Sequence, residues 1–196
     1  MTFDMLLDLY QVYRSRGDSY HGMSHMRECF AELTKLVDAN LIENEEAMRL
    51  AIWFHDYYQN HTGDDEECSA KKAHAAALAL GYDETFAKIV YRLILVTKHG
   101  VHSPVTNDEK FMVDIDLAPF AADNFAERTM KVRVEYPNVD DNTFLLARRE
   151  VLAGFLALPG IYHTPYYKER LEASAQRNLA VAVGALSSSE STTIKK

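Results

Sequence analysis

The chain of 196 residues is poor in three features that mark particular classes of protein: cysteine, long apolar stretches and an excess of basic side chains. Two cysteines cannot form a disulfide framework, so a small disulfide-stabilised secreted domain is excluded. The longest apolar stretch, Val151 to Leu158, is too short to cross a bilayer, and we expect no transmembrane segment. With 29 acidic and 21 basic residues, the net charge is −8, so we expect neither a nucleic-acid nor a membrane partner.

The cellular compartment is predicted from the N-terminal segment and the cysteines. The chain opens without a basic segment or a small-residue cleavage site, so we expect no signal peptide. Cys29 and Cys68 are interpreted as small reduced side chains that fill space. Together these features predict a cytoplasmic protein.

Helical spacing of apolar residues runs through nearly the whole chain, and no segment reads as a strand. We therefore predict an all-α fold, a single-domain helical bundle over residues 1–186, with a disordered tail over 187–196 where apolar residues are scarce. Phe3, Leu6, Leu7, Tyr10 and Tyr13 predict an amphipathic helix over 2–15, capped by Thr2. Ser24 and Asp83 are expected to cap two further helices, Asn44 to open another, and the polar loop around His61 to Asp64 to precede a fourth. Three more helices are expected at about 109–136 (broken near Pro119), 140–158 and 164–186.

The eight histidines are the unusual part of the composition, and some of them stand near acidic residues in apolar surroundings. His55 and Asp56 directly follow the apolar segment Ile52 to Phe54, where a lone charge is disfavoured. Asp114 and Asp116 lie within another apolar run that contains no basic residue. Buried carboxylates need a partner or a metal ion, so the candidate ligands are His21, His25, His55, Asp56, Asp114 and Asp116.

The order of these residues resembles the HD superfamily of metal-dependent phosphohydrolases, which are all-helical proteins named for their His-Asp pair. The closer similarity is to a subgroup of predicted phosphohydrolases with Tyr-His-x-x-x-His, Trp-Phe-His-Asp and Asp-x-Asp-Leu motifs. These motifs match Tyr20 to His25, Trp53 to Asp56 and Asp114 to Leu117. The resemblance extends over about residues 5–185, with further matches at Glu66 to Ala70, Arg133 to Tyr136, Arg148, Val151-Leu152 and Arg177-Asn178.

The resemblance implies that His25, His55, Asp56 and Asp116 are the metal ligands. His21 is the alternative for the first position and Asp114 the alternative for the last. Two imidazoles and two carboxylates suit a divalent ion, and manganese, iron, magnesium, zinc, cobalt and nickel all accept such donors. A metal-activated water would then cleave a phosphate ester or anhydride of a small molecule, with nucleotides among the candidate substrates.

Other residues are candidates for proton transfer and for holding phosphate. Asp56 and Glu66 are predicted to be catalytic, with Glu67 as an alternative to Glu66. Some superfamily nucleotidases have a glutamate three residues after the His-Asp pair, whereas this chain has Gln59, which cannot accept a proton. The predicted phosphate contacts are His21, Lys98, His99, Arg133 and Arg148, with His102 as an alternative to His99.

Gln59 leaves a second function open. Because an amide cannot take a proton from water, the same metal centre would also suit a module that binds or senses a phosphorylated ligand without turnover. A helical adaptor with a vestigial site is the third hypothesis, and it ranks last because no residue of the ligand set is missing.

Overall fold

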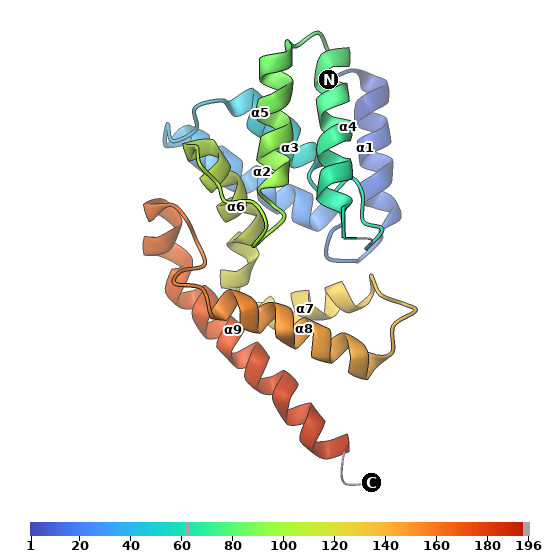
Figure 1. Cartoon of the computed structure of the whole chain (residues 1–196), viewed down its shortest axis with the longest axis vertical. Helices are drawn as coiled ribbons and strands as arrows, with labels where there is room; N and C mark the ends of the chain where they lie inside the picture. Colours follow the sequence, from blue (N-terminus) through green and yellow to red (C-terminus); the bar gives the residue numbers. More distant parts are fainter. Residues whose placement is uncertain (62, 194–196) are drawn as a thin grey trace. The chain divides into compact units, whose positions relative to one another are not determined.

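The computed structural model describes residues 1–61 and 63–193, with side chains described as far as residue 186. All regular structure in this part of the chain is helical, which confirms the predicted all-α class. The helices are α1 (Phe3–Ser15), α2 (Met23–Asp38), α3 (Glu45–Phe54), α4 (Asp65–Ala79), α5 (Glu84–Leu95), α6 (Asn107–Leu117), the 3-10 helix η1 (Ala118–Ala121), α7 (Phe125–Arg133), α8 (Asp141–Leu156) and α9 (Pro165–Thr193) (Figure 1).

The chain divides into two compact units, one from Met1 to Asp116 and the other from Leu117 onward. The first unit contains α1 to α5 and nearly all of α6, and it holds most of the residues that the sequence motifs single out. The second contains η1 and α7 to α9. The limits predicted for a single domain, 1–186, stay a prediction.

Helix α3 is the centre of the first unit. Ala47, Met48, Ala51 and Ile52 are fully buried, because α2, α4 and α5 all pack against this short helix. Helices α4 and α5 lie side by side in Figure 1, joined by a turn in which Gly81 has a φ of 91°. The buried face of α4 consists mostly of alanines, and these small side chains let the two helices approach closely.

Most of the predicted helix starts are confirmed. Side chains of Thr2, Asn44 and Asp83 accept hydrogen bonds from backbone amides of the first turns of α1, α3 and α5. The prediction for the second helix was wrong, because α2 begins at Met23 with Gly22, not Ser24, in the capping position. A Cβ atom at residue 22 would lie 3.2 Å from the carbonyl oxygens of Gly17 and Ser19, so the close chain approach here favours glycine.

The buried face of α1 differs from the predicted one. Leu9 and Tyr13 are fully buried, whereas Phe3 is 77% exposed, and Leu6, Leu7 and Tyr10 are also exposed. The i, i+3, i+4 spacing identified a helix correctly but chose the wrong stripe. Tyr13 belongs to the predicted set and is buried, and its phenol donates a hydrogen bond to the carbonyl oxygen of Trp53 at 2.9 Å.

The second unit consists of helices joined by short connections. The helix predicted over 109–136 is interrupted, as expected, at Pro119, which lies in η1. Asn178 of α9 donates to the carbonyl oxygens of Phe120 and Ala122, both at 2.9 Å, and so ties α9 to the end of η1. Helix α9 continues to Thr193, beyond the predicted helix end at 186, and the remainder of the predicted tail, residues 194–196, lies outside the described residues.

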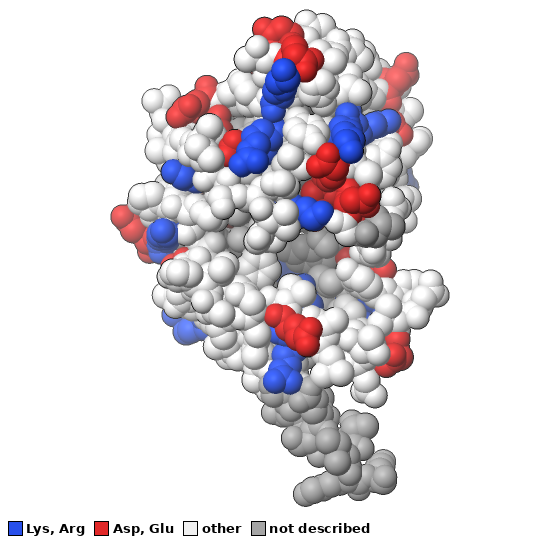
Figure 2. All heavy atoms as spheres, viewed as in Figure 1, with Lys and Arg blue, Asp and Glu red and all other residues white. Residues whose placement is uncertain are grey.

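The charged surface of the first unit is mixed. Figure 2 shows basic and acidic side chains interspersed on the viewed face, as on an ordinary solvated surface. Within the described part of the chain, no helix has the length and apolar character needed to span a bilayer.

Candidate metal centre

The His-Asp pair lies where α3 ends. The backbone amide of His55 donates to the carbonyl oxygen of Ala51 at 2.8 Å, so the last helical turn continues to this residue. Nδ1 of the imidazole is 2.8 Å from the carbonyl oxygen of Ile52, to which it donates its hydrogen. This contact orients the ring and leaves Nε2 to face the interior of the first unit.

His25 comes from the first turn of α2 and meets His55 there. The two Nε2 atoms are 3.3 Å apart, and both side chains are 1% exposed. The ring of Tyr20 stacks on the His25 ring at a centroid distance of 5.2 Å and fixes its plane. The structure therefore brings together two imidazole nitrogens from different helices.

Two carboxylates complete a cluster around these nitrogens. Asp116 Oδ1, near the end of α6, lies 3.1 Å from His25 Nε2 and 3.6 Å from His55 Nε2. Asp56 Oδ2 lies 3.1 Å from His55 Nε2 and 3.6 Å from His25 Nε2. We call His25, His55, Asp56 and Asp116 the four-residue cluster. Its members are separated by up to 91 positions in the sequence, yet these donor atoms lie close together.

The electrostatics of the cluster are dominated by its two carboxylates. Burial alone would raise the pKa of Asp56, but the positive charges of His55, His21 and His25 outweigh it and hold that pKa well below its usual value. Burial acts in the same direction on Asp116, where the neighbouring imidazoles of His25, His55 and His99 keep the pKa low. Burial would lower the pKa of His55, but the negative charges of Asp56 and Asp116 raise it well above normal.

One oxygen of the cluster, Asp56 Oδ2, indicates whether these residues suit a cation. Asp56 Oδ2 is buried and accepts no hydrogen bond in the described part of the chain; its contact with His55 lacks hydrogen-bond geometry. The other oxygen, Oδ1, accepts a hydrogen bond from the amide of Gln59 at 3.0 Å. One buried and one partly buried carboxylate, those of Asp56 and Asp116, leave negative charge uncompensated beside the two imidazoles whenever the imidazoles are neutral. This mixed nitrogen and oxygen donor set fits a divalent cation.

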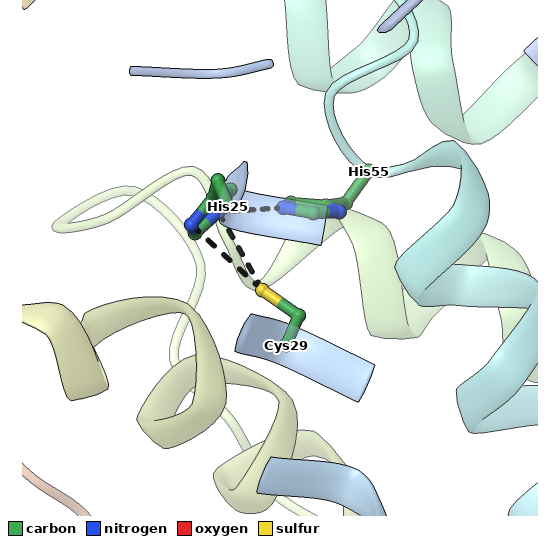
Figure 3. Close-up of side chains that lie close together, drawn as sticks. All are labelled: His25, Cys29 and His55. Carbon is green, nitrogen blue, oxygen red and sulfur yellow. Dashed lines mark hydrogen bonds between the residues drawn. The ribbon is translucent and has the colours of Figure 1, made fainter. Parts of the chain in front are cut away.

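Cys29 adds a sulfur beside the two histidines. Ligand atoms of His25, Cys29 and His55 all lie within 4.8 Å of one another, and this buried group could hold a metal ion (Figure 3). Burial, followed by the charges of Asp116 and Asp56, raises the pKa of the Cys29 thiol well above its usual value. The sequence interpretation as a space-filling side chain missed this position, although the i, i+4 spacing of His25 and Cys29 on one helix was a usable signal.

Arg16 is a second residue that the sequence did not single out. Its guanidinium donates from Nη1 to the carbonyl oxygen of His21 at 2.7 Å and from Nη2 to those of Asp56 and Tyr57 at 2.6 and 2.9 Å. The end of α1 thereby binds both the segment before α2 and the last carbonyls after α3. A cation at this position also suits the negative end of the α3 dipole.

The two alternative metal ligands, His21 in place of His25 and Asp114 in place of Asp116, are not members of the four-residue cluster. His25 belongs to the cluster, while the ring of His21 lies edge-on to it at a centroid distance of 6.0 Å. Asp116 likewise belongs to the cluster, and Asp114 is fully buried elsewhere on the same helix. The cluster thus contains His25 and Asp116, and the choice of metal ligand at these two positions stays a prediction.

Two further predicted residues lie at or near the edge of the cluster. His99 follows α5 and places Nε2 2.9 Å from Asp116 Oδ2, with a quarter of its side chain exposed. Lys98 donates from its ammonium to the carbonyl oxygen of Gly63, in the loop after the His-Asp pair. That loop is held in turn by Asp65, whose carboxylate accepts from the amides of Asn60 and His61 at 3.0 and 2.7 Å.

The predicted glutamates begin α4. Glu66 is half-buried, and among the described residues no hydrogen bond or ion pair joins it to the four-residue cluster. Glu67 accepts from the phenol of Tyr91 at 2.6 Å and pairs with Lys71, contacts that lower its pKa. The catalytic role of Glu66 stays a prediction.

Arg133 and Arg148 belong to the second unit. Arg133 donates to the carbonyl oxygens of Tyr136 and Val139 at 2.6 and 2.8 Å and pairs with Asp141, so it organises the connection from α7 to α8. Arg148 is half-buried in α8. Their predicted contacts with phosphate stay predictions.

Comparison of the chain with protein-family models, with curated proteins and with solved structures finds no match in any of the three. The resemblance to the HD superfamily therefore rests on the sequence motifs alone.

Proposed function

We propose that the chain is a metal-dependent phosphohydrolase of the HD type. The observation that carries the proposal is the convergence of His25, His55, Asp56 and Asp116 in one buried cluster, in which Asp56 Oδ2 accepts no hydrogen bond from the described residues. The same four residues are the ligands that the sequence resemblance implies.

The ion would be held by Nε2 of His25 and His55, Oδ2 of Asp56 and Oδ1 of Asp116. Donors about 2.0–2.2 Å from one ion lie roughly 2.8–3.6 Å from each other in octahedral and tetrahedral sites. The separations of 3.1 to 3.6 Å between the imidazole nitrogens and carboxylate oxygens agree with this range. Manganese, iron, magnesium, zinc, cobalt and nickel are all compatible with the donor set.

A bound divalent ion would supply Lewis acidity towards a phosphoryl oxygen and lower the pKa of a water. The chain's own residues would orient the substrate around it. His99 contacts Asp116 and is partly exposed, so it can reach a phosphate oxygen while fixing the carboxylate. His21 and Lys98 are further phosphate contacts that we propose within the first unit, with Glu66 as the residue that moves a proton.

The proposed substrate is a small phosphorylated molecule, and nucleotides are the first class to examine. We infer a cytoplasmic location, because both cysteines are free and one is fully buried beside the cluster. The acidic net charge of −8 supports the view that neither nucleic acid nor a membrane is a partner.

Gln59 favours a second function, a module that binds or senses a phosphorylated ligand without turnover. Its side-chain amide donates to Asp56 Oδ1, so it serves as a hydrogen-bond donor and not as a proton acceptor. On this alternative the ion and the phosphate are held, but no group activates water.

Phosphate release separates the two functions. Protein loaded with manganese would be incubated with a panel of nucleotides and sugar phosphates, beside Asp116→Asn and the control His74→Ala, whose histidine lies outside the cluster and pairs with Glu84. The enzyme proposal expects release by the wild type and the control and a loss of at least about 100-fold in Asp116→Asn. Tight binding of a phosphorylated compound without any product would contradict the enzyme and support the sensing module.

A further inference from the structure

The thiol of Cys29 lies next to the imidazole of His25, one of the proposed metal ligands (Figure 3). Its Sγ is 3.6 Å from His25 Nε2 and 3.9 Å from His25 Nδ1. His25 and Cys29 are four positions apart on α2, so consecutive turns of one helix present them together. Both residues are 1% exposed.

These separations match the dimensions of a zinc site that contains a thiolate. Zn–N bonds of about 2.0–2.1 Å and Zn–S bonds of about 2.3 Å at tetrahedral angles place nitrogen pairs about 3.4 Å apart and nitrogen–sulfur pairs about 3.5 Å apart. The His25–His55 nitrogen separation is 3.3 Å and the His25–Cys29 separation is 3.6 Å. Two of the three donor–donor separations of such a site are therefore present. A small side-chain adjustment would bring His55 Nε2 and Cys29 Sγ to the third.

We propose that the centre has a second set of ligands, His25, His55 and Cys29 as thiolate, and that it uses this set for thiophilic divalent ions such as zinc and cadmium. Manganese and magnesium are held by the two carboxylates and the imidazoles and leave the thiol untouched. On binding of a thiophilic ion the S–H bond breaks, a metal–sulfur bond forms and the proton is released to solvent. No electron transfer is involved.

Donor softness makes the two ligand sets selective. Thiolate prefers zinc and softer ions, whereas carboxylate suits manganese and magnesium. The Cys29 thiol must lose its proton before its sulfur binds an ion, so the metal–sulfur bond must supply the free energy for that loss. Hard ions gain little from sulfur and therefore stay with the oxygen donors.

This inference rests on the metal centre of the proposed function but not on its hydrolytic activity. A chain that binds manganese and hydrolyses nothing would still show the second ligand set. Conversely, hydrolysis without any cadmium–thiolate bond at Cys29 would support the proposed function and contradict this inference.

The first test uses Cys68→Ser, in which Cys29 is the sole remaining thiol. Addition of cadmium to this protein should produce the ultraviolet charge-transfer band of a cadmium–thiolate bond, together with release of a proton in weakly buffered solution. Manganese should not produce this band, and cadmium should release one proton more than manganese does, because manganese leaves the thiol protonated. Absence of the cadmium band in correctly folded Cys68→Ser protein would overturn the proposal.

The second test compares affinities for cadmium and manganese by calorimetry in wild type, Cys29→Ser and Cys68→Ser. Removal of the Cys29 sulfur should weaken cadmium binding at least about tenfold, because a direct ligand contributes no less than the outer partners whose loss costs about 10–100-fold. Manganese affinity should stay within about threefold of the wild type on the same comparison. Equal weakening for both ions would instead make Cys29 an outer-sphere partner of His25 and contradict the proposal.

Discussion

Arg16 donates a hydrogen bond from Nη2 to the backbone carbonyl oxygen of Asp56 at 2.6 Å, across 40 positions of sequence. The same guanidinium holds the carbonyl oxygen of His21, four residues before the first cluster histidine. One side chain at the end of α1 thus positions the two backbone segments that carry His25 and the His-Asp pair.

Arg16→Met removes this clamp and should weaken manganese binding by about 10–100-fold, the usual cost of losing a group that supports metal ligands. Metal-free stability should fall by about 2 kcal/mol, because hydrogen bonds from a charged donor are lost. Calorimetry and denaturant unfolding measure the two effects. Arg14→Met is the matched control, since Arg14 is exposed and its guanidinium donates to the hydroxyl of the nearby Tyr10. Equal behaviour of the two variants would contradict the positioning role.

Gln59→Leu tests the amide that holds Asp56. The variant loses the donor to Asp56 Oδ1, so the carboxylate can rotate and manganese affinity should fall about tenfold. Gln176→Leu changes an exposed amide in the second unit that donates to Glu172, and it should bind manganese like the wild type. Unchanged affinity in Gln59→Leu would show that Asp56 is oriented without this hydrogen bond.

The metal-free protein should respond to pH through the cluster. The carboxylates outweigh burial and raise the pKa of His55 above 6.5, so this pairing stabilises the fold fully below about pH 6.5 and less as the pH rises through the raised value. The lowered pKa values of Asp56 and Asp116 give stability that is complete above about pH 3.8 and is lost in stronger acid.

The metal-free Tm should therefore be highest between about pH 4 and pH 6.5 and fall towards pH 9. Metal binding needs neutral imidazole, so the rise in Tm caused by manganese should grow from about pH 6 to pH 8. Thermal scans with and without manganese measure both trends. A metal-free Tm that is flat from pH 6 to pH 9 would contradict the inferred pairing of His55.

His99→Gln separates substrate contact from metal binding. Glutamine can still donate to Asp116 Oδ2, so bound metal should stay near the wild-type amount while KM for a phosphorylated substrate rises about tenfold through loss of the imidazole contact with phosphate. Metal analysis and steady-state kinetics provide the two readouts. Loss of the metal with an unchanged KM would assign His99 to ion binding instead.

Local sequence signals predicted the helices and most of their starts, because caps and turn residues act over a few positions. Asn44 and Asp83 are examples, since each side chain bonds an amide three residues away. Ser24 was the wrong cap because the determining contact is the close approach of Gly22 to the carbonyl of Gly17. No propensity or periodicity rule registers such an approach.

The sequence also supplied the members of the four-residue cluster, but not the residues that hold them. His55 and Asp56 were conspicuous as charges at the end of an apolar helix. Arg16 acts on backbone carbonyls, which carry no sequence signature, and its partners lie up to 41 residues away. The hydrogen bond from the Tyr13 hydroxyl to the Trp53 carbonyl oxygen likewise joins residues 40 positions apart and leaves no signal in the spacing of apolar residues.

The central claim is that one divalent ion binds at the four-residue cluster, and metal content tests it most directly. Untagged wild type, His55→Ala and the control His74→Ala would be soaked with manganese, iron or zinc, freed of excess ion and submitted to elemental analysis. We expect near-stoichiometric metal in the wild type and in His74→Ala, and a large loss of metal in His55→Ala. Absence of metal from the wild type, or equal metal in all three proteins, would contradict the central claim.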